Sequence, residues 1–211
     1  MSCAPALRIA VDAARRAGAL FRAELHQPSG PRGRGDKAPA DTEVELQIRS
    51  ALLAATPYGY VGEETGEPLE GADPSHRWIV DPDDGTAAFL KGLRGASVSI
   101  ALVRGDVPVL GVVYAYAHPD DDGDLIAWAE GAGPITRNGV AVERRLDDLT
   151  LDHGSIVIVS RRADDGLARR HARRSPRPRR SVGEAGEPGQ RIADADRAAR
   201  DLRRWRAGPR P

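Results

Sequence analysis

The chain has 211 residues, of which 40% are hydrophobic and 29% are charged, and its formal net charge at pH 7 is zero. No apolar run approaches the roughly 18 residues of a membrane span, and the N-terminus lacks the basic and then apolar pattern of a signal peptide. The single cysteine, Cys3, excludes an internal disulfide and favours a reducing compartment, so we expect a cytoplasmic protein with no membrane partner.

Two helices are expected before the first strand. Apolar residues at helical spacing predict one helix over residues 5–25 and another over residues 42–55. The segment between them is rich in glycine and proline and is expected to form a loop. Thr42 and Glu45 match a capping box, in which Thr42 is the N-cap and Glu45 is the third helical residue.

A pair of glutamates follows the first expected strand. Residues 58–61 predict this strand, and Gly62, Glu63 and Glu64 come directly after it. Such a pair is usually solvated surface. Because it ends a strand and lies shortly before a second group of acids, we expect the two groups to converge at one site.

The second group of acids lies in a turn. Trp78, Ile79 and Val80 predict the end of a buried strand, and the next nine residues, Asp-Pro-Asp-Asp-Gly-Thr-Ala-Ala-Phe, predict a tight turn and the start of a helix. Asp81 and Asp84 would repel each other unless a cation lay between them, and hard oxygen ligands favour Mg²⁺.

Two further interpretations of this turn differ in what it binds. The N–H groups of Gly85 and Thr86 would lie at a helix N-terminus, where phosphate is stabilised. The alternative is an acidic surface turn with no ligand. An EF-hand loop is excluded because glycine comes one residue early, and an aspartyl-phosphate phosphatase is excluded because Pro82 occupies the position of the nucleophile.

Alternating apolar residues then predict a run of strands over residues 96–103, 107–116 and 125–129, with a further strand at residues 155–160. Together with the two helices, these strands indicate an α+β protein.

The last part of the chain has a different composition. Residues 161–211 contain 16 arginines but only 7 aspartates and glutamates, and they include few large apolar residues. We therefore expect a folded domain over residues 1–160 and a basic, disordered or degenerate tail over residues 161–211. An interaction protein that uses this tail is an alternative function, but only Trp205 is aromatic there and no motif is present, so nucleic-acid binding is not expected.

The acidic turn resembles the signature of the inositol monophosphatase family, which is a strand followed by Asp-Pro-x-Asp-Gly-Thr-x-x-Phe. The matching residues are Asp81, Pro82, Asp84, Gly85, Thr86 and Phe89. Gly62, Glu63 and Glu64 match the Gly-Glu-Glu that the family has upstream. Asp83 departs from the signature, because the family usually has an apolar residue at this position.

The resemblance implies the layered αβαβα fold of the sugar phosphatases, with the N-terminal half present and the C-terminal half incomplete. It also implies Mg²⁺-dependent hydrolysis of a small phosphate monoester, in which Asp81, Asp84, Glu63 and the carbonyl of Asp83 bind Mg²⁺. Thr86 and Glu63 would be catalytic, and the N–H groups of Gly85 and Thr86 would bind phosphate.

The resemblance also suggests residues that support the site and a range of substrates. Glu45 stands near the place of a family aspartate and, like Glu64, would support the metal ligands. The partner would be a small phosphorylated substrate, such as an inositol phosphate, phosphoadenosine phosphate or histidinol phosphate, and a complete fold would permit a homodimer.

The resemblance ends in the second half of the chain. The family supplies a further metal ligand from a Trp-Asp pair, whereas Trp205 is followed by Arg206. Arginine outnumbers lysine by 29 to 2, which suits GC-rich DNA. We therefore expect a truncated or frame-shifted family member, and a catalytically impaired protein is the alternative to an active phosphatase.

Overall fold

Two long helices precede the sheet, and they are α1 (Ala4–Leu25) and α2 (Pro39–Ala55). The computed structural model describes residues 2–66 and 68–143, which belong to one compact unit, Met1–Arg144. Within this part of the chain, no helix combines the length and the apolar composition that crossing a membrane requires. The first helix confirms the one expected over residues 5–25.

The second helix begins earlier than expected. Ala38 is its N-cap, has extended backbone angles and makes no side-chain capping hydrogen bond. Pro39 follows as the first helical residue, a position that suits its fixed φ and its missing N–H. The predicted capping box is therefore wrong, because Thr42 lies inside the first turn and Glu45 lies one turn further along α2.

The strands form one mixed sheet in chain order, β1 to β7. β1 and β2 are parallel, and every other neighbouring pair is antiparallel. The strands are β1 (Tyr58–Gly62), β2 (Asp73–Asp84), β3 (Ser97–Arg104), β4 (Val107–Ala115), β5 (Asp124–Ala129), β6 (Thr136–Arg137) and β7 (Val140–Ala141). A short helix, α3 (Thr86–Phe89), follows β2. The expected α+β class is confirmed, as are the strands predicted around β3, β4 and β5.

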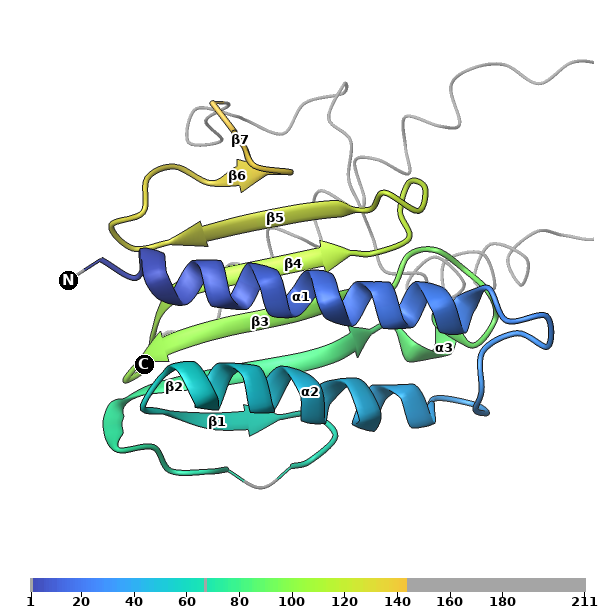
Figure 1. Ribbon diagram of the computed structural model, residues 1–211, viewed down its shortest axis with the longest axis horizontal. Helices are drawn as coiled ribbons and strands as arrows, with labels where there is room; N and C mark the ends of the chain where they lie inside the picture. The colour runs from blue at the N-terminus through green and yellow to red at the C-terminus, as the bar shows by residue number, and fades with distance from the viewer. Residues whose placement is uncertain (1, 67, 144–211) are drawn as a thin grey trace, which may run out of the picture. The chain divides into compact units, whose positions relative to one another are not determined.

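One face of the sheet packs against α1 and α2, which lie side by side across it (Figure 1). A row of paired residues on neighbouring strands is buried on this face, and it consists of Val80, Ile100, Val112 and Ala127. Side chains on the opposite face, including Ile79, Val113 and Ile126, are exposed. The alternation of buried and exposed residues follows from the two-residue period of a strand.

The elements that contain the acidic residues end at the same edge of the sheet (Figure 1). β1 and β2 run in the same direction, and α3 follows the end of β2. α2 begins at this edge too, so its first turn lies near the ends of both strands. The strand expected at residues 155–160 and the domain boundary expected near residue 160 lie outside the described residues.

Gly18 allows α1 to lie close to the end of β4, and we predict that Gly18→Ala destabilises the fold. A Cβ at this position would lie 2.5 Å from Cε1 of Tyr114 and 2.7 Å from Cβ of Tyr116. Overpacking of this kind should lower the free energy of unfolding by about 1–3 kcal/mol in urea denaturation. Gly111→Ala is the matched control, because nothing lies within 4 Å of its added Cβ. Equal effects of the two substitutions would contradict the close packing at Gly18.

Candidate functional site

A bulge in β2 places two aspartates on the same face of the sheet. Asp81 pairs with Ser99 on β3, and Asp84 pairs with Ser97, so three steps along β2 match two steps along β3. In a regular strand, side chains three residues apart point to opposite faces. The extra residue resets this alternation, and the side chains of Asp81 and Asp84 therefore lie on the same side as the two serines.

The backbone of the turn is fixed by bonds that meet at Asp83. Its N–H donates to Oδ1 of Asp81 at 3.0 Å, and its carbonyl accepts from the hydroxyl of Thr86 at 3.1 Å. Gly85 follows with a φ of 117°, which glycine adopts without strain, and its carbonyl accepts from the N–H of Phe89 in α3. The turn thus has a defined conformation, and α3 continues from it for only four residues.

Glu45 supports the turn that follows β1. It is fully buried, and its carboxylate accepts from the N–H of Glu64 at 2.7 Å and from the N–H and hydroxyl of Thr65. Gly62 leaves room for this carboxylate, because a Cβ on Gly62 would lie 2.0 Å from Oε1 of Glu45. Glu45 therefore orients the backbone of the Glu63–Glu64 turn, and all its described hydrogen bonds are to that turn.

Asp41 is a site residue that the sequence did not reveal. It lies in the first turn of α2 and is only 1% exposed, and its Oδ1 has no hydrogen-bond partner among the described residues. Burial raises the pKa of Asp41 to about 6, the nearby hydroxyl of Thr86 lowers it, and Glu64 and Glu63 raise it. Asp41 therefore lies close to Glu63 and Glu64, the two acids that follow β1. Pro39 was the available signal, because a helix that starts there has Asp41 in its first turn.

The acids of the site raise one another's pKa values. Burial and a hydrogen bond shared with Glu63 raise the pKa of Asp81 to about 7, and Asp84 adds to the effect. Burial raises the pKa of Asp83 to about 8, although its hydrogen bond with Tyr116 lowers it. Such shifts mean that ionising all of these groups together is unfavourable unless positive charge is close.

One lysine lies close to this group of acids. Partial burial and the neighbouring Glu63 and Glu45 raise the pKa of Glu64, whereas Lys37 lowers it. Lys37 belongs to the loop between α1 and α2, where its backbone pairs with that of Arg34.

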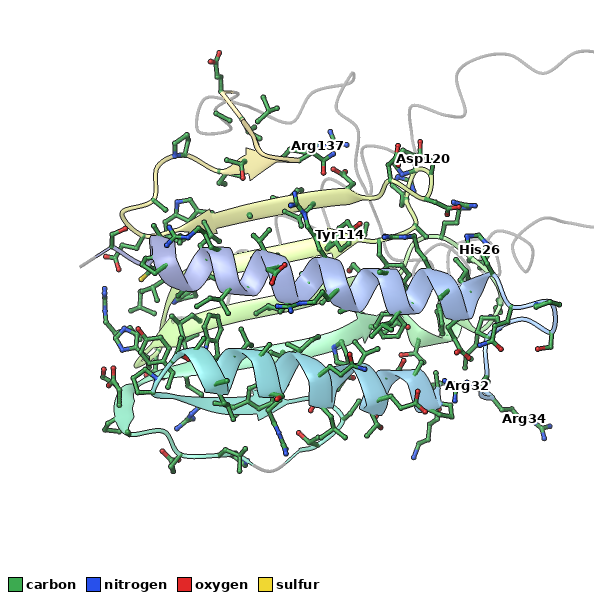
Figure 2. The ribbon with its side chains drawn as sticks, in the orientation of Figure 1. His26, Arg32, Arg34, Tyr114, Asp120 and Arg137 are labelled. Atoms are coloured by element: carbon green, nitrogen blue, oxygen red, sulfur yellow. The ribbon has the colours of Figure 1, made fainter. Side chains whose placement is uncertain are left out.

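An ion-pair network fixes this loop to both helices. Arg32 donates to Glu24 on α1 at 2.8 Å and to Glu43 on α2 at 2.9 Å, and it lies beside the start of α2 (Figure 2). Glu24 is buried, whereas Glu43 is exposed. The loop with Lys37 is therefore connected to α1 and α2 by the same guanidinium group.

The donor set fits a hard divalent cation, but the described residues do not complete a site for one. Oxygen donors suit Mg²⁺, and Asp41 adds a buried carboxyl group whose Oδ1 has no hydrogen-bond partner among the described residues. Within residues 2–66 and 68–143, however, no three side chains of His, Cys, Asp or Glu are grouped closely enough to bind one ion together. These residues provide part of a coordination sphere.

The structure places the predicted residues in one region. Asp81, Asp83, Asp84, Gly85 and Thr86 lie on the bulged turn and at the start of α3. The carboxylate of Glu63 lies next to Asp81, and Glu45 lies beneath the backbone of Glu64. The α3 helix is too short for a strong dipole, so phosphate binding by Gly85 and Thr86 would depend on their N–H groups.

Comparison with known proteins gives a family match over most of the chain. The model of the inositol monophosphatase family matches residues 3–183. Inositol-1-monophosphatase of Rhizobium meliloti (strain 1021) is 39% identical over 120 residues, which are 55% of this chain and 43% of that protein. Nus factor SuhB of Vibrio cholerae is 32% identical over 151 residues, which are 69% of this chain and 55% of that protein.

Solved structures give the same fold. The extragenic suppressor protein suhB of Bartonella henselae matches with a TM-score of 0.55 and 32% identity, over 64% of this chain and 52% of that one. The inositol monophosphatase of Anabaena matches with a TM-score of 0.52 and 29% identity, over 64% and 48% of the two chains. The chain spans about half the length of the curated relatives it matches.

The hydrogen bonds of Glu45 predict a larger stability effect than that of an exposed glutamate on the same helix. Glu45→Gln keeps the size of the side chain but replaces one accepting oxygen by an NH₂ group, which cannot accept from the backbone N–H groups of Glu64 and Thr65. It should lower the free energy of unfolding by about 1–3 kcal/mol. Glu43→Gln removes only an exposed ion pair and should cost less than about 1 kcal/mol. Urea denaturation measures both, and equal losses would show that the buried contacts of Glu45 are not special.

Proposed function

Because the chain belongs to the inositol monophosphatase family, we propose that it hydrolyses a small phosphate monoester with the help of Mg²⁺ in the cytoplasm. The ligands would be Asp81, Asp84, Glu63 and the main-chain carbonyl of Asp83. The observation that supports this proposal most directly is the bulged turn, which presents Asp81 and Asp84 on one face with Glu63 next to Asp81.

In this proposal, side chains of the region would orient the attacking water and accept its proton. Bound Mg²⁺ would supply positive charge against the phosphate dianion and lower the pKa of water. Glu63 would accept a proton from the attacking water. Thr86 would orient that water through its hydroxyl oxygen, since its proton is donated to the carbonyl of Asp83.

Asp41 extends this proposal to a residue outside the sequence motif. The pKa of Asp41 is raised to about 6, largely by burial, so the carboxylate is close to a proton-accepting range near neutral pH. It lies near Thr86, whose hydroxyl group lowers its pKa. We therefore assign Asp41 as a second proton acceptor beside Glu63, with the phosphate charge facing Gly85, Thr86 and the cation.

The names of the relatives suggest the substrates to test first. The curated relatives include inositol-1-monophosphatases and a fructose-1,6-bisphosphatase/inositol-1-monophosphatase of Aquifex aeolicus. A suitable panel contains inositol 1-phosphate, fructose 1,6-bisphosphate, histidinol phosphate and phosphoadenosine phosphate, each with and without Mg²⁺.

A protein that binds metal but catalyses poorly is the second candidate. The observation that favours it is the absence, within the described residues, of three acids grouped closely enough to bind one ion. An interaction protein is a further alternative, and the relative from Vibrio cholerae is named a Nus factor and not a phosphatase. The basic segment at residues 161–211 would then supply an interaction surface for an acidic partner.

The first prediction of this proposal concerns metal affinity. Asp81→Asn replaces a carboxylate by a neutral amide, which is a poorer ligand for a hard cation. We expect its affinity for Mg²⁺ or Mn²⁺ to fall by at least the roughly 10–100-fold that is typical for loss of a supporting contact. Calorimetry measures this, and Asp106→Asn is a control, because Asp106 lies in the hairpin between β3 and β4. Unchanged affinity in Asp81→Asn would mean that the turn binds no metal.

The second prediction concerns the rate. The described residues supply only part of a coordination sphere, so positive charge near the leaving group should be weakly fixed. Loss of one well-placed charge commonly costs about 10³-fold in rate. We therefore expect Mg²⁺-dependent phosphate release slower than about 1 s⁻¹ for the best substrate of the panel. A faster steady-state rate would contradict this expectation, because the positive charge around the leaving group would then be well fixed.

A further inference from the structure

Asp83 is a polar residue whose carboxyl group is almost completely buried near the end of β2. It is 2% exposed, and its Oδ1 accepts a hydrogen bond of 2.7 Å from the hydroxyl of Tyr116, which is 1% exposed. Its Oδ2 has no partner among the described residues. Burying a carboxylate in this way is unfavourable without compensation, so the hydroxyl of Tyr116 is important for keeping the side chain in place.

Tyr116 connects the turn to the core from two sides. It follows the end of β4, and its ring stacks on Phe21 of α1 with the ring centroids 5.1 Å apart. Phe89, the last residue of α3, approaches the same ring edge-on at 6.4 Å. Tyr116 therefore contacts the bulged turn through Asp83 and the helix after the turn through Phe89.

The side chain and the backbone groups of Asp83 have different hydrogen-bond partners. The side chain points into the core towards Tyr116, while its N–H orients the carboxylate of Asp81 and its carbonyl accepts from Thr86. A rotation of residue 83 that released the side chain would move this N–H and this carbonyl together. The hydrogen bond with Tyr116 thus restrains the groups that face the cation.

We propose that Tyr116 and Asp83 are positioning residues, and that their buried hydrogen bond fixes the orientation of the metal-binding turn. The proposal rests on the proposed function, because the turn must bind a cation for its orientation to matter. Neither side chain contacts the cation in this arrangement. Both act through the backbone of residue 83, on the carbonyl of Asp83 and the carboxylate of Asp81.

The test compares two tyrosines of the same strand end. Tyr116→Phe keeps the stacked ring and removes the hydroxyl that Asp83 needs. Tyr114→Phe is the matched control, because Tyr114 is also buried (Figure 2). Its hydroxyl accepts a hydrogen bond of 2.8 Å from Arg22 and donates to the carbonyl of Asp122, so it has no bond to the bulged turn. Mn²⁺ binding to the full chain, followed by electron paramagnetic resonance, reports the site without any need for turnover.

We expect Tyr116→Phe to lower Mn²⁺ affinity by about 10-fold or more, as loss of a supporting contact typically does. Tyr114→Phe should stay within about two-fold of the wild type, because a lost hydroxyl away from the turn affects stability and not ligand orientation. Wild-type affinity in Tyr116→Phe would overturn the inference, and so would equal losses in both variants. Asp81→Asn distinguishes a failure of this inference from a failure of the proposed function. Unchanged Mn²⁺ affinity in Asp81→Asn would contradict the proposed function itself.

A second pair of variants decides the question if Tyr116→Phe does not fold. Asp83→Asn and Asp83→Leu both remove the charge and have similar sizes, but only the asparagine keeps an oxygen that accepts from Tyr116. We expect Mn²⁺ affinity to be at least about five-fold higher in Asp83→Asn than in Asp83→Leu. Equal affinities in these two variants would overturn the inference, because the hydrogen bond would then have no effect on the turn.

Discussion

Burial of several neighbouring carboxyl groups is the constraint on which this region depends. Asp41 and Asp83 are almost completely buried, and the pKa values of Asp41, Asp81 and Asp83 are raised to between about 6 and about 8. Without a cation, the raised pKa of Asp81 favours its protonated form near neutral pH. A divalent cation bound there would compete with that proton and offset the repulsion between Asp81 and Glu63.

The fold brings these groups together because several elements end at one edge of the sheet. Glu63 directly follows β1, and Asp81 and Asp84 lie on either side of the bulge in β2. Asp41 lies in the first turn of α2. Glu45 and Asp83 then use buried hydrogen bonds to orient the two turns. Acids that lie far apart in the chain thus lie in one region, and the buried residues that orient them contribute to its geometry.

Local sequence patterns predicted the parts of this site that depend on neighbouring residues. Strand alternation and the Asp-Pro-Asp-Asp-Gly-Thr segment located β2 and α3, because proline and glycine restrict the backbone directly. The sequence predicted that the strand ends at Val80, whereas β2 continues through a bulge to Asp84. Asp41 was missed because Thr42 and Glu45 suggested a later helix start, whereas Pro39 determines the actual one. The contact between Asp83 and Tyr116 spans 33 positions and depends on how β4 ends beside the turn, which no local pattern contains.

Affinity for metal and catalytic rate need not change together in such a protein. The described residues supply carboxylates at one end of the strands, and a cation bound there would offset the repulsion of Asp81 by Glu63 and Asp84. Catalysis has a further requirement, because positive charge must be fixed around the leaving group as well as around the attacking water. Measured metal affinity therefore tests the described carboxylates, whereas the measured rate tests the complete arrangement of charge. The orientation of the turn by Asp83 and Tyr116 would matter in both cases, since it acts on the ligands that precede any chemistry.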